Sequence, residues 1–263
     1  VQEKDVTPRR EAHTLRDAAR QAEAAALTRL PQQGKVMACV ADQPVSSHYM
    51  YNGSFTWFAA WRFVHRARLG LVPLNAYNRR AGANRGCRRC TYGQETLPHV
   101  TNHCFGGHRE AYQERHDALL DRLVRATPVF PGDSVRRNQR VPGTDSPLRP
   151  DLVVTRGDRV ILADVTVSFE NRPEALRAAA AEKEAKYAGL VAELRRQGRV
   201  ASVHALVVGS LGTWFRGNEA TLRQLRVSRV YARLMRKLMV SDTLLWTRHI
   251  YIEHVTGRRQ YEV

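Results

Sequence analysis

Residues 149–169, RPDLVVTRGDRVILADVTVSF, contain two apolar segments on either side of the pair Gly157-Asp158. Two such segments joined by a short glycine-containing turn are typical of a β-hairpin. We therefore expect strands at Leu152 to Thr155 and at Val160 to Phe169.

The segments after this hairpin alternate between helical and strand patterns. Pro173 begins a long helical segment that ends near Gly198, and the apolar segment after it has the composition of a central strand. The expected elements are a helix at 173–198, a central strand at Val203 to Val208, a helix at 219–240 and a short strand at Ile250 to Ile252. This order predicts an α/β fold with a mixed sheet flanked by helices.

The segments before the hairpin favour helices, which we expect at 11–29, 55–69 and 109–126. Residues 127–150 are rich in Pro and Gly, which interrupt regular structure, and we place a domain boundary there. The predicted organisation is a basic helical linker at 1–80, a metal-binding knuckle with its following helix at 81–126, a connector at 127–150 and a sheet domain at 151–263.

The charge of the chain favours a polyanionic partner. The 263 residues include 42 Lys and Arg against 25 Asp and Glu, a net charge of +17, and residues 43–94 contain no acidic residue. Because arginine donates two parallel hydrogen bonds to a phosphate, we expect this block to bind nucleic acid. The alternative is a solvated helix face.

A hydrophobic content of 43% is enough for a packed core and argues against disorder. No apolar run reaches the roughly 18 residues of a membrane span, and the N-terminus lacks the apolar core of a signal peptide. We therefore expect an intracellular protein with no membrane partner.

A Cys/His cluster follows the basic block. Cys87, Cys90, His99 and Cys104 have the spacing C-x2-C-x8-H-x4-C. Three thiolates and one imidazole complete the tetrahedral shell of a structural Zn²⁺ and leave no open position for catalysis. His103 is the alternative histidine ligand, and ordinary buried thiols are the alternative to a metal site. Cys39 stands apart and is expected to be a core residue.

Two carboxylates in the hairpin predict a second metal site. Asp151 opens the first strand, and Asp164 lies within the apolar second strand, on the same face as Leu162 and Thr166. A carboxylate in such a strand is costly unless it is paired or binds a cation. Oxygen ligands of this kind suit Mg²⁺ or Mn²⁺. The alternative is a pair of surface or capping aspartates.

A lysine on the following helix extends this site. At 100° per residue, Lys183 falls within the apolar stripe of Leu176, Tyr187 and Leu190, whereas Lys186 lies at its edge. We expect the Lys183 ammonium within about 6 Å of the Asp164 carboxylate, where opposite charges couple. The alternative is a lysine that extends past its neighbours to solvent.

Together, Pro150-Asp151, Asp164 and Lys183 resemble the PD-(D/E)xK pattern of restriction-like nucleases. The pattern is altered, because Thr166 stands where that family has lysine, and the lysine has moved to the next helix. With the knuckle and the segment from Lys183 through Lys186 to Tyr187, the chain from about Gly34 onward resembles the C-terminal region of site-specific non-LTR retrotransposon proteins. This resemblance implies a restriction-endonuclease-like fold for 151–263.

The resemblance also implies an activity, a nicking of double-stranded target DNA that primes reverse transcription in the nucleus. It implies Asp151, Asp164, Lys183, Lys186 and Tyr187 as catalytic residues. The element RNA and an N-terminal reverse transcriptase of the same polyprotein are the other implied partners. The expected nucleic-acid-binding residues are Arg62, Arg66, Arg68, Arg79, Arg80, Arg88, Arg89 and Arg149.

Two other functions remain compatible with the sequence. The chain could be a nucleic-acid-binding module of a retrotransposon protein whose nuclease is inactive without the polymerase. A repair or restriction enzyme of host origin would share the fold, but it would not explain the knuckle.

Overall fold

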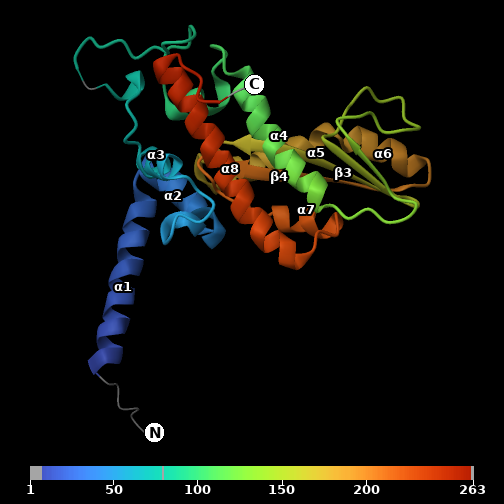
Figure 1. Cartoon of the computed structure of the whole chain (residues 1–263), viewed down its shortest axis with the longest axis horizontal. Helices are drawn as coiled ribbons and strands as arrows, with labels where there is room; N and C mark the ends of the chain where they lie inside the picture. The colour runs from blue at the N-terminus through green and yellow to red at the C-terminus, as the bar shows by residue number, and fades with distance from the viewer. Residues whose placement is uncertain (1–7, 79, 262–263) are drawn as a thin grey trace.

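A computed structural model describes residues 8–78 and 80–261. The helices before the sheet include those predicted at 11–29, 55–69 and 109–126, and α2 was not predicted. Helix α1 extends away from the rest of the molecule (Figure 1). The elements of this half are α1 (Pro8–Arg29), α2 (Gln33–Ala41), η1 (Pro44–Met50), α3 (Phe58–Arg68), η2 (Asn75–Tyr77), η3 (His99–His103) and α4 (Arg109–Ala126).

A four-stranded mixed sheet follows, with the strand order β1-β2-β3-β4. The predicted hairpin is confirmed, because β2 and β3 pair in antiparallel fashion around a turn in which Gly157 has φ +60°. Strand β1 is antiparallel to β2, and β4 is parallel to β3. The strands are β1 (Ser134–Arg137), β2 (Leu152–Arg156), β3 (Arg159–Ser168) and β4 (Val200–Gly209).

Two predictions about the sheet were wrong. The segment 127–150 is more than a connector, since it contributes the edge strand β1. Strand β4 lies at the opposite edge rather than in the centre. Its apolar composition reflects burial of both faces by helices, including α5 and α7.

The helices after the hairpin are broken where the sequence suggested continuity. The expected helix at 173–198 is two helices, α5 (Arg172–Lys186) and α6 (Ala188–Arg196), which meet at Tyr187. The expected helix at 219–240 is divided between α7 (Asn218–Gln224) and α8 (Arg229–Thr256).

The short strand predicted at Ile250 to Ile252 was also wrong, because these residues belong to α8. The buried residues Thr247, Ile250, Tyr251 and His254 recur at helical spacing. The helix ends at Gly257, whose left-handed φ of 76° closes its C-terminus.

Helices cover both faces of the sheet. On one face, alternate residues such as Leu152, Ile161 and Val165 share a core with α4 and α8, which lie side by side (Figure 1). On the other face, Val153 and Leu162 pack against residues of α6 and against Tyr187. Asp164 belongs to this second face, as its alternation with Leu162 predicted.

The predicted domain boundaries do not separate independent cores. One apolar cluster joins Val36, Val64 and Val100 from the N-terminal half to Leu152 and Leu244 from the sheet and α8. None of the helices in the described part of the chain combines the length and apolar composition that crossing a membrane requires.

Candidate nuclease centre and zinc knuckle

The two predicted carboxylates lie next to each other in the β2–β3 hairpin. Asp151 immediately precedes β2, and its Oδ2 accepts a hydrogen bond from the backbone N–H of Val165 at 2.7 Å. Val165 follows Asp164 on β3, so the two aspartates occupy adjacent positions across the hairpin. The Asp164 side chain is 2% exposed and that of Asp151 is 14% exposed.

Two residues of the helical layer reach Asp164. The Lys183 ammonium lies 2.5 Å from Oδ1, which confirms the expected proximity of that lysine to the carboxylate. The Tyr187 hydroxyl donates to Oδ2 at 2.6 Å. Lys186 is exposed, and its ammonium lies over the Tyr187 ring at 4.8 Å from the centroid. Helical phase therefore predicted correctly which of the two lysines lies next to Asp164.

The break between α5 and α6 explains the position of Tyr187. Its φ of −101° and ψ of 3° end α5 and direct the ring into the core beneath the sheet. Burial, and then the hydrogen bond to Asp164, raise the pKa of Tyr187. The phenol therefore stays protonated and donates to the carboxylate.

A residue that the sequence did not predict contacts Asp151. His116 of α4 lies with Nε2 2.9 Å from Asp151 Oδ2 and Nδ1 3.2 Å from Asp117 Oδ1. Burial lowers the pKa of His116, but the contacts with Asp151 and Asp117 outweigh it and leave the pKa above its usual value. Asp117 also forms an ion pair with Arg137 of β1, whose Nη2 lies 3.3 Å from Asp117 Oδ1.

The donor set at this centre fits a divalent cation. Two carboxylates on adjacent strands supply the oxygen ligands that Mg²⁺ prefers. Among the described residues, Oδ1 of Asp151 receives no hydrogen bond, so one oxygen of this carboxylate is free for a ligand.

The predicted zinc ligands converge in space. The ligand atoms of Cys87, Cys90, His99 and Cys104 lie within 4.8 Å of one another. Sγ of Cys87 is 3.8 Å from Sγ of Cys104, and Sγ of Cys90 is 3.3 Å from His99 Nε2. His99 is buried whereas His103 is exposed, so His99 is the histidine of the cluster. This donor set fits a tetrahedral Zn²⁺.

The knuckle is attached to the C-terminal end of α8 by buried polar contacts. His254 Nε2 lies 2.8 Å from Glu95 Oε1 and 3.8 Å from Cys87 Sγ, and its Nδ1 lies 3.0 Å from His108 Nε2. Arg89 Nε donates to the His254 carbonyl at 2.8 Å. A Cβ at Gly257 would lie 2.8 Å from Arg89 Nη2, so glycine there permits the close approach.

Glu95 is the charged centre of this attachment. Burial raises its pKa, but hydrogen bonds from Arg88 and neighbouring backbone amides outweigh burial and lower the pKa to about 2. Glu95 therefore stays ionised and orders the knuckle loop through Arg88, whose Nε lies 2.8 Å away. Sequence spacing gave no sign of these contacts because Glu95 and His254 are far apart in the chain.

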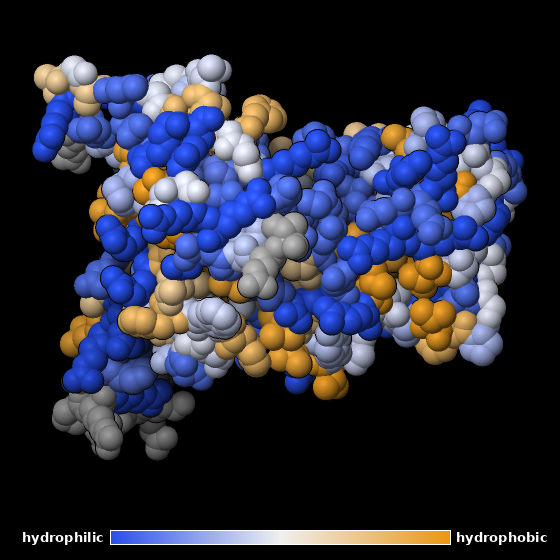
Figure 2. Space-filling view, turned by 45° about the horizontal axis from the view of Figure 1, so that its top comes forward, coloured by the Kyte–Doolittle hydropathy of each residue, from blue (hydrophilic) through white to orange (hydrophobic). Residues whose placement is uncertain are grey.

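The structure divides the expected nucleic-acid-binding arginines. Arg68 is 5% exposed and donates to the carbonyls of Leu211 and Ser46, so it is removed from this set. Arg79 lies outside the described residues. Arg88 and Arg89 are exposed, but they donate hydrogen bonds to Glu95 and to the His254 carbonyl. The other exposed members of the set are Arg62, Arg66, Arg80 and Arg149. Hydrophilic residues dominate the face of the molecule in Figure 2.

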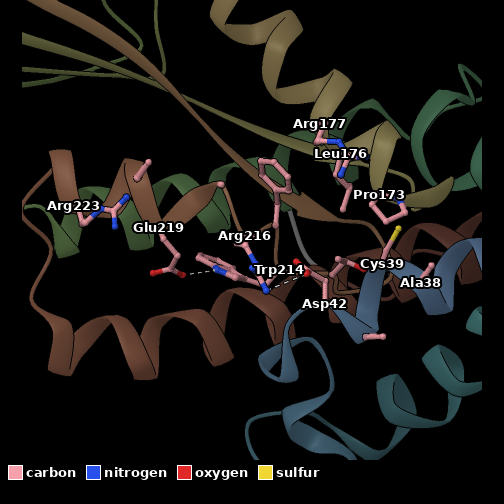
Figure 3. Close-up of a pocket in the computed structure, with 15 residues that line it drawn as sticks. Ala38, Cys39, Asp42, Pro173, Leu176, Arg177, Trp214, Arg216, Glu219 and Arg223 are labelled. Carbon is pink, nitrogen blue, oxygen red and sulfur yellow. Dashed lines mark hydrogen bonds and ion pairs between the residues drawn. The ribbon is translucent and has the colours of Figure 1, made fainter. Parts of the chain in front are cut away.

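A hollow of about 860 Å³ lies away from the predicted site residues, between α2, α5 and the start of α7 (Figure 3). It is lined by Trp214, whose indole N–H donates to Glu219, and by Arg216, which pairs with Asp42 at 3.3 Å. Cys39 of its wall is 1% exposed, as expected of a core residue, and burial raises the pKa of its thiol to about 12. Such a thiol is protonated and unreactive.

Comparison with known proteins supports the relationship to a retrotransposon protein. No protein-family model matches the chain. Over 192 residues the chain is 32% identical to the retrovirus-related Pol polyprotein from type-1 retrotransposable element R2 of Popillia japonica. The match covers 70% of the chain and 39% of that polyprotein. The chain is thus a homologue of part of a retrotransposon Pol polyprotein.

Proposed function

We propose that this chain is a metal-dependent DNA endonuclease that nicks target DNA during retrotransposon insertion. One observation carries the proposal. A lysine ammonium lies 2.5 Å from a buried carboxylate, Asp164, beside a second carboxylate, Asp151, on the neighbouring strand. The combination of two acidic groups and a lysine provides both a cation site and a positive charge for a phosphodiester.

The proposed roles follow from the contacts of each side chain. Asp151 and Asp164 bind Mg²⁺ or Mn²⁺, which when bound supplies Lewis acidity to water and to the phosphodiester. Lys183 stabilises negative charge that develops on the phosphate. Tyr187 and His116 act as positioning residues, because each holds one carboxylate by a hydrogen bond.

The wider function rests on the relationship to a retrotransposon polyprotein. The nick would expose a 3′ end that primes reverse transcription in the nucleus, with double-stranded DNA, element RNA and a reverse transcriptase of the same polyprotein as partners. In this proposal, the hairpin and its helices form a restriction-endonuclease-like domain, and the Zn²⁺ site is structural. Lys186, Arg80 and Arg149 are exposed and would contact the DNA backbone.

A second candidate is a nucleic-acid-binding module whose nuclease is inactive without the polymerase. This candidate is favoured by the fact that both carboxylates already form ion pairs with side chains of the same chain. Asp164 is neutralised by Lys183, and Asp151 by His116. In this alternative, a larger assembly would have to separate these pairs before the cation could bind.

Supercoiled plasmid distinguishes the two candidates. The zinc-loaded chain is incubated with plasmid in Mg²⁺, in Mn²⁺ or in EDTA, and the conversion to relaxed circles is followed. The proposal predicts relaxation that depends on the divalent cation. Plasmid that binds the protein but stays supercoiled in both cations would favour the binding module.

A further inference from the structure

We propose that the segment leading into α3 and the exposed face of α3 form a binding site for single-stranded nucleic acid. We call Tyr51, Phe55, Trp57 and Phe58 the aromatic platform. None of these residues belongs to the proposed cleavage centre, so this site would add single-strand binding to the nicking of a duplex.

The aromatic platform exposes an unusual amount of ring surface. Tyr51 is 98% exposed, Trp57 73%, Phe58 70% and Phe55 51%. Large aromatic residues normally contribute to a core or an interface, so four exposed rings within eight consecutive residues mark a binding surface.

The backbone supports the exposure of Phe55. Its φ of 60° is in the left-handed region, which is strained for a bulky residue. Such a conformation persists only where the surrounding structure enforces it, and residues of this kind gather at functional sites.

Helix α3 continues the platform with arginines. Phe58, Arg62 and Arg66 are spaced four residues apart and are all exposed, whereas Phe63 and Val64 are buried. The Arg62 guanidinium carbon lies 5.9 Å from the centroid of the Phe58 ring. An aromatic ring is thus followed by two positive charges along one helix face.

A shallow hollow of about 210 Å³ lies between this face and α8. Arg62 and Arg66 of α3 and Arg248 of α8 line it, and Phe63 and Tyr251 are also part of its wall. Within residues 8–78 and 80–261, none of these three arginines forms an ion pair with a carboxylate, and Arg66 Nη2 donates to the Leu71 carbonyl at 3.3 Å. Guanidinium groups that have no carboxylate partner and that line a small hollow suit a phosphate.

The chemistry of the surface favours a single strand over other occupants. Bases can stack on exposed rings only when they are not paired within a duplex, and the backbone then follows a positively charged track. Because residues 43–94 contain no acidic residue, this segment suits a polyanionic partner and would repel a partner protein with a basic surface. Rings supply base stacking, and the three arginines supply phosphate contacts.

Binding of a fluorescently labelled dT12 oligonucleotide to the zinc-loaded chain tests this site by anisotropy. Replacing one stacking ring by alanine weakens binding about fivefold or more. We therefore expect the double substitution Trp57→Ala and Phe58→Ala to weaken dT12 binding at least tenfold, while Trp57→Phe retains most of it. Phe130→Ala is the matched control, because this ring is 51% exposed, as Phe55 of the platform is, but lies outside the platform.

Two further measurements separate this site from the proposed nuclease. A duplex of the same length should bind the double variant nearly as well as the wild type, and Asp164→Ala should bind dT12 unchanged. If the platform variant binds dT12 as the wild type does, or loses duplex binding to the same degree, the site is not a single-strand platform. Tyr51→Ala, at a 98% exposed position, repeats the test if the double variant does not fold.

Discussion

The Cys/His knuckle, which we propose binds zinc, and the proposed nuclease centre are built in opposite ways. The four knuckle ligands come from one segment, 87–104, whose ligand atoms converge within 4.8 Å. The nuclease centre draws on separate elements, with Asp151 before β2, Asp164 on β3, Lys183 on α5 and His116 on α4. Local spacing was therefore sufficient to predict which four side chains converge at the first site, but it did not predict every contact of the second.

The two sites are nevertheless joined through the same helices. The knuckle contacts the end of α8 through His254, and α8 packs beside α4, which carries His116 to Asp151. A segment that is local in sequence is thus connected by packing to the centre assembled from distant parts of the chain.

Loss of zinc is expected to have the largest effect. Structural zinc contributes roughly 10 kcal/mol of folding free energy in small zinc peptides. Cys90→Ser should release the metal and increase hydrogen exchange in 80–110 and also in α8 near His254, because the knuckle loop contacts that end. Cys39→Ala, which removes a core thiol instead, is the control that should keep its zinc.

Sequence alone suggests that this loss stays local, since a Pro-rich segment lies between the knuckle and the sheet. The contacts between the knuckle and α8 instead predict that the loss of order extends to the end of α8. Unchanged exchange in α8 would show that the knuckle is independent of the rest of the fold. Metal analysis that finds no zinc in protein purified without chelators would contradict the structural zinc site itself.

Lys183→Ala should lower the cleavage rate by about 10²–10³-fold, as expected when a group that stabilises developing charge is removed. DNA affinity should change little, because this side chain is only 27% exposed and faces Asp164. Lys186→Ala is the matched comparison three residues away, and it should weaken binding or cleavage only partly. Equal losses of cleavage in the two variants would show that the position against Asp164 has no special role.

His116→Ala is expected to have a smaller effect, about a 10–100-fold loss of affinity for Mn²⁺ at the centre, as for other residues that hold a metal ligand. Calorimetric titration of Mn²⁺ measures this without any cleavage. His116→Gln, which keeps a side-chain N–H donor, should restore part of the affinity, and His103→Ala at an exposed position should have none of this effect. Unaltered Mn²⁺ binding by His116→Ala would show that His116 does not position Asp151 for metal binding.

Salt should change DNA affinity gradually, without a threshold. Log affinity should fall linearly with log salt concentration, with a slope of about −0.9 for each phosphate neutralised on a duplex. Arg62→Ala and Arg149→Ala should each reduce that slope modestly, whereas Arg68 is buried and makes no such contribution. An affinity that is the same at low and physiological salt would exclude the basic surface as the binding surface.

Features with a local origin were predictable from the sequence. These features include the hairpin at Gly157 and the convergence of the four Cys/His residues of the knuckle. They also include the alternation that places Asp164 opposite Val165 and the helical phase of Lys183. Each depends on neighbours in the nearby sequence. Such patterns follow from the fixed periods of strands and helices.

Features that depend on tertiary packing were missed. The break at Tyr187 is stabilised by a hydrogen bond to a strand residue, Asp164, and β1 exists because it pairs with β2. The C-terminal part of α8 was mistaken for a strand because its short apolar alternation is also compatible with a helix that is buried on one face. His116 carries no local signal, since its partner Asp151 belongs to another element.

The proposed function depends on Asp164 belonging to a centre that cuts DNA. Its most direct test is the single-turnover cleavage of a labelled duplex by saturating wild type and Asp164→Ala in Mg²⁺, with DNA affinity and melting temperature measured on the same samples. We expect Asp164→Ala to bind the duplex with wild-type affinity, to stay folded and to cut no faster than the EDTA control. Cleavage by Asp164→Ala at the wild-type rate would contradict the proposed function.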